Sequence, residues 1–230
     1  MKGLQSMELE ALYSIFFNKQ GEVLKRNKIT PFLVSVPPDY DDYLLKIMFY
    51  EGVGIPEWAA EINFDLNIHE LMALHAHYME KSPSSSPFWS YYHYLVHRSN
   101  KVLTNDSICW VPNTLTKFCR QGKASFKDAA SCNNELLRSE LNILNPDILV
   151  LLSNPNNRKA SLIIEEAMGE YESVPTKIDR VYRLKFKDSA IPCLRVDSAM
   201  YQEVTHTKQL IQDYIFDFAL DELRARYAQS

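Results

Sequence analysis

Four short runs of apolar residues constrain the fold of this chain more than any other feature of its sequence. The runs are Leu44–Tyr50, Ile108–Val111, Asp147–Leu152 and Pro192–Val196. Short and nearly continuous apolar runs are typical of strands that are buried on both faces of a parallel sheet. The sequence therefore predicts a central sheet of four mainly parallel strands.

Amphipathic patterns with a helical period surround these runs. The predicted helices are Leu9–Lys19, with Gly21 just past its end, His69–Glu80, Phe88–His97, Ala129–Leu144, Ser161–Met168 and a last helix from about His206 to Tyr227. Strands that alternate with helices predict a three-layer α/β/α sandwich. Because the chain has no repeat, low-complexity tail or evident linker, we expect one domain over residues 1–230.

Composition narrows the class of protein. A chain of 230 residues that is 46% hydrophobic has ample material for a packed core. No stretch approaches the roughly 18 uninterrupted apolar residues of a membrane span, and no apolar h-region follows Met1. We therefore expect a cytoplasmic protein without membrane contact, and we expect it to be a monomer.

Charge and cysteine usage exclude some kinds of site. The net charge of −4 disfavours a generic nucleic-acid coat but not an enzyme with a local basic face. Basic residues cluster at Lys117, Arg120, Lys123 and Lys127, and again at Arg158 and Lys159. The four cysteines lie far apart without a Cys-x-x-Cys pair, which predicts reduced core thiols and neither a metal nor another cofactor.

Ligands of such sheets bind beyond the carboxyl ends of the strands, so the segments after each strand are candidate sites. Gly52 and Gly54 follow the first run and allow a backbone to approach a ligand closely, while Glu51 and Glu57 could position or deprotonate a water. A tight turn flanked by solvated glutamates explains the same residues.

The other segments carry polar groups suited to a nucleic acid. The Asn113 amide could pair with one edge of a base, and it could equally be a strand-end cap. Residues 82–87 present serine hydroxyls on a proline-stiffened loop, which suits phosphate contact or an ordinary connector. Residues 153–159 place small polar groups before a helix, as a phosphate site or an N-cap would.

Taken in order, these segments resemble the uracil-DNA glycosylase superfamily from about Leu44 to Tyr214. Five segments resemble, in turn, its water-activating loop, proline-rich loop, base-reading asparagine, Gly–Ser loop and minor-groove loop. They are Gly52–Trp58, Ser82–Trp89, Val111–Thr116, Ile148–Lys159 and Val196–Ala199. Asn145–Ile148 resembles the family's lead into its third strand.

The resemblance implies a monofunctional DNA glycosylase that flips a nucleotide out of DNA and hydrolyses its N-glycosidic bond. Asn113 would recognise the base, and Glu57 or Glu51 would position the water. The pocket would be formed by Gly52, Val53, Gly54, Ile55, Trp58 and Asn113, and DNA would be held by Ser82, Ser84, Lys117, Ser153, Asn154, Lys159, Met200 and Tyr201.

Two departures from the family pattern point away from plain uracil. Gly54-Ile55-Pro56 stands where the family carries a water-orienting Asp or Asn, and Met200 lies near the position of the family histidine, for which His206 is a weak substitute. Glycines in place of a bulky residue leave room for a larger base, such as a modified cytosine in phage DNA. The enzyme would then serve in antiviral defence.

Two rival interpretations remain open. The loss of both family catalytic positions also fits a catalytically inactive glycosylase fold that binds DNA or a protein. Histidines at 69, 75, 77, 93 and 97 could instead hold a metal, although the glutamate of a His-Glu-x-x-His motif is missing. The aromatic neighbours of His93 favour a half-buried helix with polar-tipped rings over a metal site.

Overall fold

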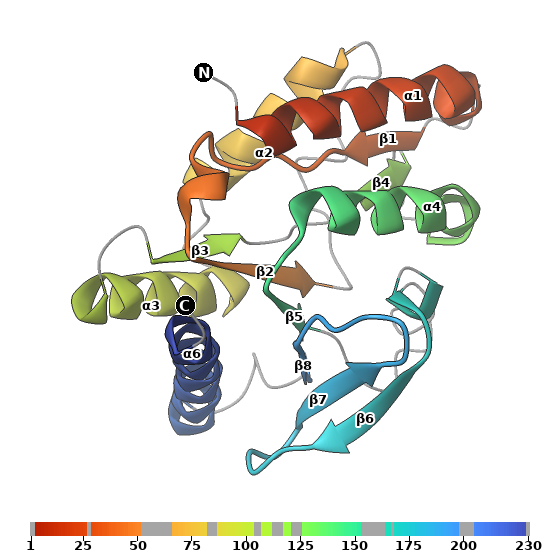
Figure 1. The fold of residues 1–230 in the computed structure, drawn as a ribbon. Coiled ribbons are helices and arrows are strands. Elements are labelled where there is room, and N and C mark those ends of the chain that lie inside the picture. The colour runs from red at the N-terminus through yellow and green to blue at the C-terminus, as the bar shows by residue number, and fades with distance from the viewer. Residues whose placement is uncertain are drawn as a thin grey trace. The chain divides into compact units, whose positions relative to one another are not determined.

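The computed structural model describes residues 3–26, 29–51, 66–81, 87–103, 107–111, 117–120, 126–152, 164–166, 168–197 and 205–228. The helices are α1 (Leu4–Arg26), α2 (Ile68–Lys81), α3 (Pro87–Val102), α4 (Phe126–Leu144) and α6 (Thr205–Tyr227) (Figure 1). The strands are β1 (Ile29–Phe32), β2 (Leu45–Glu51), β3 (Ile108–Val111), β4 (Lys117–Arg120), β5 (Ile148–Leu152), β6 (Tyr171–Pro175), β7 (Val181–Phe186) and β8 (Cys193–Val196), with a short 3-10 helix at Tyr40–Asp42.

The main sheet confirms the four predicted strands and their parallel arrangement. Its strand order is β3-β2-β5-β8-β7-β6. The first four strands in this order are the four apolar runs, and each is parallel to its neighbour within that group. Every residue of β3 and β5 is buried, as expected of strands covered on both faces. The protein is therefore an α/β protein with a mainly parallel sheet core.

The predicted strand number of four was too small, because β7 and β6 extend the sheet to six strands. Strand β7 pairs antiparallel with β8, and β6 pairs antiparallel with β7. Exposed polar residues interrupt them, as in the Val-Tyr-Arg-Leu-Lys-Phe sequence of β7. Antiparallel strands at a sheet margin leave part of a face in water, so they lack the continuous apolar run that reveals a doubly buried strand.

The chain folds into two compact units. The first consists of residues 1–41, 53–81 and 114–145, and it holds α1, α2, α4 and the β1–β4 ladder. The second consists of residues 42–52, 82–113 and 146–230, and it holds the six-stranded sheet with α3 and α6. Both units are discontinuous in sequence, and one domain over residues 1–230 stays a prediction.

Hydrogen bonds between buried polar groups link three segments of the first unit. The Tyr13 hydroxyl donates to Glu140 Oε1 at 2.8 Å and accepts the Val34 backbone N–H at 3.2 Å. Tyr13 and Glu140 are completely buried. Because buried polar groups are stable only when they are hydrogen-bonded, this chain of contacts ties α1, α4 and the segment after β1 to one arrangement.

Helix α1 is longer than predicted. It continues through Gly21, which was expected to lie beyond its end, as far as Arg26. Leu24, one turn past Gly21, is buried, and burial of an apolar face contributes more than the roughly 1 kcal/mol that a helical glycine costs. By contrast, α2 begins within one residue of the prediction, because Asn67 and Glu70 form a reciprocal capping box before it.

In the second unit, α3 and α6 cover one face of the sheet. Trp110 of β3 donates its indole N–H to Ser99 Oγ of α3 at 2.7 Å, and the Arg183 guanidinium of β7 lies over the Phe218 ring of α6 at 4.8 Å. Trp110 also stacks on Phe49 of β2. Val150 of β5 pairs with Phe49 on one side and with Leu194 on the other, and Leu194 pairs with Arg183. These strand residues therefore share one face of the sheet.

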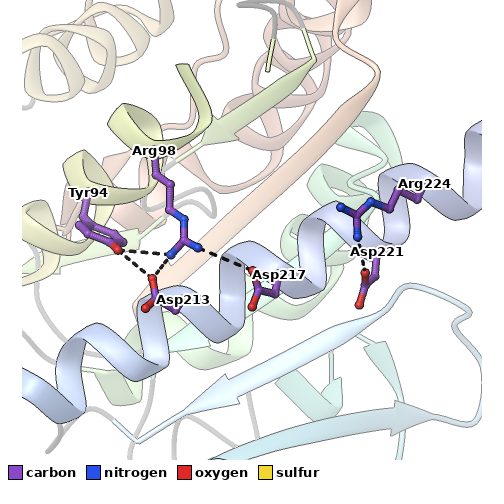
Figure 2. Close-up of polar contacts among 6 residues, drawn as sticks. All are labelled: Tyr94, Arg98, Asp213, Asp217, Asp221 and Arg224. Carbon is purple, nitrogen blue, oxygen red and sulfur yellow. Dashed lines mark hydrogen bonds and ion pairs between the residues drawn. The ribbon is translucent and has the colours of Figure 1, made fainter. Parts of the chain in front are cut away.

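Polar contacts join these two helices (Figure 2). Tyr94 of α3 donates its hydroxyl to Asp213 of α6 at 2.7 Å, and Arg98 pairs with Asp213 and, at 3.8 Å, with Asp217. The Arg98 guanidinium also lies 4.5 Å from the centre of the Phe216 ring. Tyr94 is half-buried, which confirms the predicted helix with polar-tipped rings. Within the described residues, no helix is long and apolar enough to cross a membrane.

Candidate functional site

The parallel strands end together at one edge of the sheet, which we call the carboxyl edge. The last residue of β2, Glu51, pairs with the last residue of β5, Leu152, which in turn pairs with the last residue of β8, Val196. Strand β3 ends three residues earlier, with Val111 opposite Met48. The segments singled out from the sequence after these four strands therefore all leave the sheet from the same edge.

An acidic residue at the opposite edge sets this alignment. The Asp147 carboxylate accepts the Lys46 backbone N–H at 2.6 Å, and the Asp147 N–H donates to the Lys46 carbonyl at 2.9 Å. Just before it, Asn145 has φ 41° and donates its N–H to Leu141, so it ends α4 in a left-handed cap. The Asn-Pro-Asp sequence thus starts β5 in register with β2.

Only two of the sequence-predicted site residues fall among the described ones. Glu51 is the last residue of β2, and Lys117 is the first residue of β4. Lys117 pairs with Phe32 of β1, so it belongs to the first unit and not to the carboxyl edge strands. The remaining candidates lie outside the described residues: Gly52, Val53, Gly54, Ile55, Glu57, Trp58, Ser82, Ser84, Asn113, Ser153, Asn154, Lys159, Met200 and Tyr201.

Sequence reasoning missed a basic turn at the carboxyl edge. Strand β7 begins at this edge, because Val181 pairs with Val196. The turn before it is held by the Thr176 side chain, which bonds to the backbone of Ile178, and Arg180 adopts φ 59°. Two cations of this turn, Lys177 and Arg180, are therefore placed at the edge. No apolar run in the sequence indicates these two cations, because they reach the carboxyl edge only when β7 pairs with β8.

A hollow of about 340 Å³ lies next to this turn on the face covered by α6. Its cationic side is formed by Lys177, whose Nζ lies 5.8 Å from the centre of the Tyr214 ring, and by Arg183 over Phe218. Asp217 and Asp221 line the α6 side. The hollow mixes exposed charges of both signs with aromatic surface, which suits a polar ligand with a flat group.

The histidines of the described segments have different surroundings. His75 is fully buried in the first unit, where its Nδ1 accepts the Ser35 N–H at 3.2 Å and its ring packs on Phe32. His69 is exposed and pairs with Glu10, and the side chains of 77, 93 and 97 are exposed. Among the residues that the structure describes, no group of three or more His, Cys, Asp or Glu side chains could hold a metal ion.

The two cysteines whose side chains are described, Cys109 and Cys193, are free thiols in the core, as predicted. Burial raises the pKa of the Cys193 thiol well above its usual range, and the nearby Arg195 charge offsets part of that rise. A thiol held neutral in this way is a poor nucleophile. Cys193 is therefore a packed core residue whose thiol is unsuited to act as a nucleophile.

Comparisons with known proteins add nothing to this geometry, since no family model matches the chain and no curated protein sequence is significantly similar to it.

Proposed function

We propose that this protein is a DNA glycosylase that excises a modified pyrimidine by hydrolysis of its N-glycosidic bond. The observation that carries the proposal is the common carboxyl edge of β2, β3, β5 and β8. In a parallel sheet, groups that follow such strand ends converge on one ligand. The water, base and phosphate candidates Glu51, Asn113 and Ser153 lie at or within two residues of the ends of β2, β3 and β5 in the sequence.

The proposed mechanism assigns one task to each group of residues. Asn113 reads the edge of the flipped base, and Glu57 or Glu51 positions the water that attacks the sugar carbon of an oxocarbenium-like transition state. The residues proposed to hold phosphates are Ser82, Ser84, Lys117, Ser153, Asn154 and Lys159. Either Met200 or Tyr201 fills the gap left by the flipped nucleotide.

The proposed substrate is larger than uracil. Gly52 and Gly54 directly follow β2 and contribute no side chain to the wall of the base pocket, which Val53, Ile55 and Trp58 complete. A pocket of this kind accepts a substituent on the pyrimidine ring, as in the modified cytosines of phage DNA. We further propose a three-layer α/β/α sandwich that acts as a cytoplasmic monomer without a cofactor.

Duplex DNA carrying either uracil or a phage-type modified cytosine tests this proposal. We expect abasic sites in the modified DNA and none in uracil DNA. Asn113→Ala and Glu57→Gln should each lower the single-turnover rate by about 10²-fold or more, the usual contribution of a base-reading or water-positioning group. Asn100→Ala and Glu22→Gln, at exposed helix positions, are matched controls that should keep the wild-type rate.

The same assay separates the enzyme from an inactive DNA-binding module. If the protein binds modified DNA but no abasic site forms in any DNA tested, the glycosylase proposal fails and the binding module is favoured. Abasic sites in uracil DNA alone would instead contradict the enlarged pocket. A rate unchanged in both variants would remove Asn113 and Glu57 from the mechanism.

A further inference from the structure

Arg195 of β8 is a buried cation within the sheet of the second unit. Its side chain is only 7% exposed. Arg195 pairs directly with Tyr182 of β7, so both side chains stand on the same face of the sheet. This is the face opposite α3 and α6, because the next residue along β8, Val196, pairs with Val181 on the α6 side.

The described neighbours of the Arg195 guanidinium are neutral groups. Its Nη1 donates to the Tyr171 hydroxyl at 3.3 Å and its Nη2 donates to Ser173 Oγ at 3.0 Å, both on β6. The guanidinium carbon lies 5.2 Å from the centre of the Tyr182 ring and 6.0 Å from that of Tyr171. Within the described part of the chain, Arg195 Nε is buried without a hydrogen-bond partner and no carboxylate pairs with Arg195.

Among the residues that the structure describes, this arrangement leaves a buried positive charge uncompensated. A guanidinium stays protonated in proteins and has five N–H donors, of which two bond to described residues in Arg195. Burying a charge is costly unless it is paired, and stacking on aromatic rings offsets only part of that cost. The free Nε–H belongs to the planar fork that arginine uses to hold carboxylates and phosphates in a bidentate manner.

We propose that Arg195, Tyr171, Ser173 and Tyr182 form a phosphate-binding site on the sheet face opposite α3 and α6. The Tyr171 and Ser173 hydroxyls accept from the guanidinium and keep their own protons for donation, and the Tyr182 ring lies beside the guanidinium. Several donors around one cation match a tetrahedral oxoanion better than a planar carboxylate. Ser173 is exposed, so the anion enters from the β6 side.

This site is separate from the carboxyl edge and does not rest on the proposed glycosylase function. Ser173 pairs with Leu184, which pairs with Cys193, two residues before Arg195. The Arg195 side chain therefore reaches away from the carboxyl edge toward β6. The phosphate could belong to the backbone of a nucleic acid or be a free phosphate ion, and the two sources are distinguished below.

Thermal unfolding in sodium phosphate tests the site, with sodium chloride and sodium acetate at equal ionic strength as references. We expect phosphate to raise Tm of the wild type and acetate to raise it less, since a ligand that binds the native state stabilises it. Arg195→Met should abolish the phosphate shift and keep or raise Tm in chloride, because it removes an unpaired buried charge. Lys185→Met, which removes an exposed cation of β7, is the matched control and should keep the phosphate shift.

A second variant covers the case in which Arg195→Met does not fold. Ser173→Asp places a carboxylate beside Arg195 Nη2, so we expect a higher Tm in chloride and no phosphate shift. Ser14→Asp, an exposed position on α1, makes the same change in net charge and should behave like the wild type.

Short single-stranded DNA identifies the source of the phosphate. If a backbone phosphate is the ligand, the oligonucleotide raises Tm in the wild type but not in Ser173→Asp. If free phosphate is the ligand, the oligonucleotide shift is the same in both proteins. The proposal is overturned if phosphate does not raise Tm of the wild type, or if the shift persists in Arg195→Met or in Ser173→Asp.

Discussion

Cys193 shows how a side chain near the sheet centre acquires unusual chemistry from its position. Burial raises its pKa far above the usual value for a thiol. We therefore expect iodoacetamide at pH 8 to leave Cys193 unmodified in the native protein and to modify it fully in urea, as measured by peptide mass spectrometry. Modification of the native protein at a rate similar to that in urea would contradict the burial of this strand.

The same shift predicts a dependence of stability on pH. The folded protein keeps the Cys193 proton above about pH 8.5, whereas the unfolded chain releases it. Stability contributed by this group is therefore present below the unfolded pKa and is lost as the pH rises, by up to about 1.4 kcal/mol per pH unit. Urea unfolding between pH 7.5 and 9.5 measures this loss, which should be smaller in Cys193→Ala.

The residue scale also shows what sequence patterns did not reveal. His75 has the sequence spacing of a possible ligand, yet in the structure it is a core residue bonded to Ser35. Arg195 carries no local signal at all, since one arginine in an apolar strand is unremarkable until Tyr171 and Ser173 of β6 lie beside it. Both roles depend on residues that are distant along the chain.

At the scale of elements, two glycines have opposite roles and can be tested as a pair. Gly21 lies inside α1, where an added Cβ would lie 3.7 Å from the Phe17 ring, an ordinary contact. Gly169 has φ 93° before β6, and an added Cβ would lie 3.0 Å from Asp188 Oδ2. Glycine is therefore needed at 169 but not at 21.

We expect Gly21→Ala to raise the free energy of unfolding by about 1 kcal/mol, the difference between alanine and glycine in a helix interior. Gly169→Ala should lower it by a similar amount or more, because alanine is strained at positive φ. Urea unfolding followed by circular dichroism measures both changes. A loss of stability in Gly21→Ala would show that α1 ends before Gly21, as its sequence alone predicts.

At the scale of the whole molecule, net charge constrains the DNA binding that we propose. The net charge is −4, so any DNA binding must depend on a local basic surface such as the turn with Lys177 and Arg180 at the carboxyl edge. Each phosphate contact contributes about −0.9 to the slope of log K against log salt concentration. The slope therefore counts the contacts that this surface makes.

We expect Lys177→Ala to reduce that slope by about 1 for duplex DNA, as removal of one phosphate contact does. Lys187→Ala is the matched control, because Lys187 lies just past the far end of β7 and pairs with Glu170. Fluorescence anisotropy at several salt concentrations measures both slopes. Equal slopes in Lys177→Ala and the wild type would exclude this turn from the DNA-binding surface.

Local sequence accounts for the four strands of the parallel core and, to within a few residues, for most helices. Each of these elements buries an uninterrupted run or a regular stripe of its own residues, so its pattern is visible without knowledge of its neighbours. The same reasoning predicts the candidate segments after Glu51, Val111, Leu152 and Val196, since the position of a ligand in a parallel sheet follows from strand direction.

Other features arise only from contacts between distant segments. Strands β6 and β7 are half-solvated, so pairing with β8, and not their own hydropathy, makes them part of the sheet. Their addition places Lys177 at the carboxyl edge and encloses Arg195 among neutral groups. Hydrogen bonding between strands and the burial of a charge are properties of the assembled sheet, and for this reason no local pattern of residues encodes them.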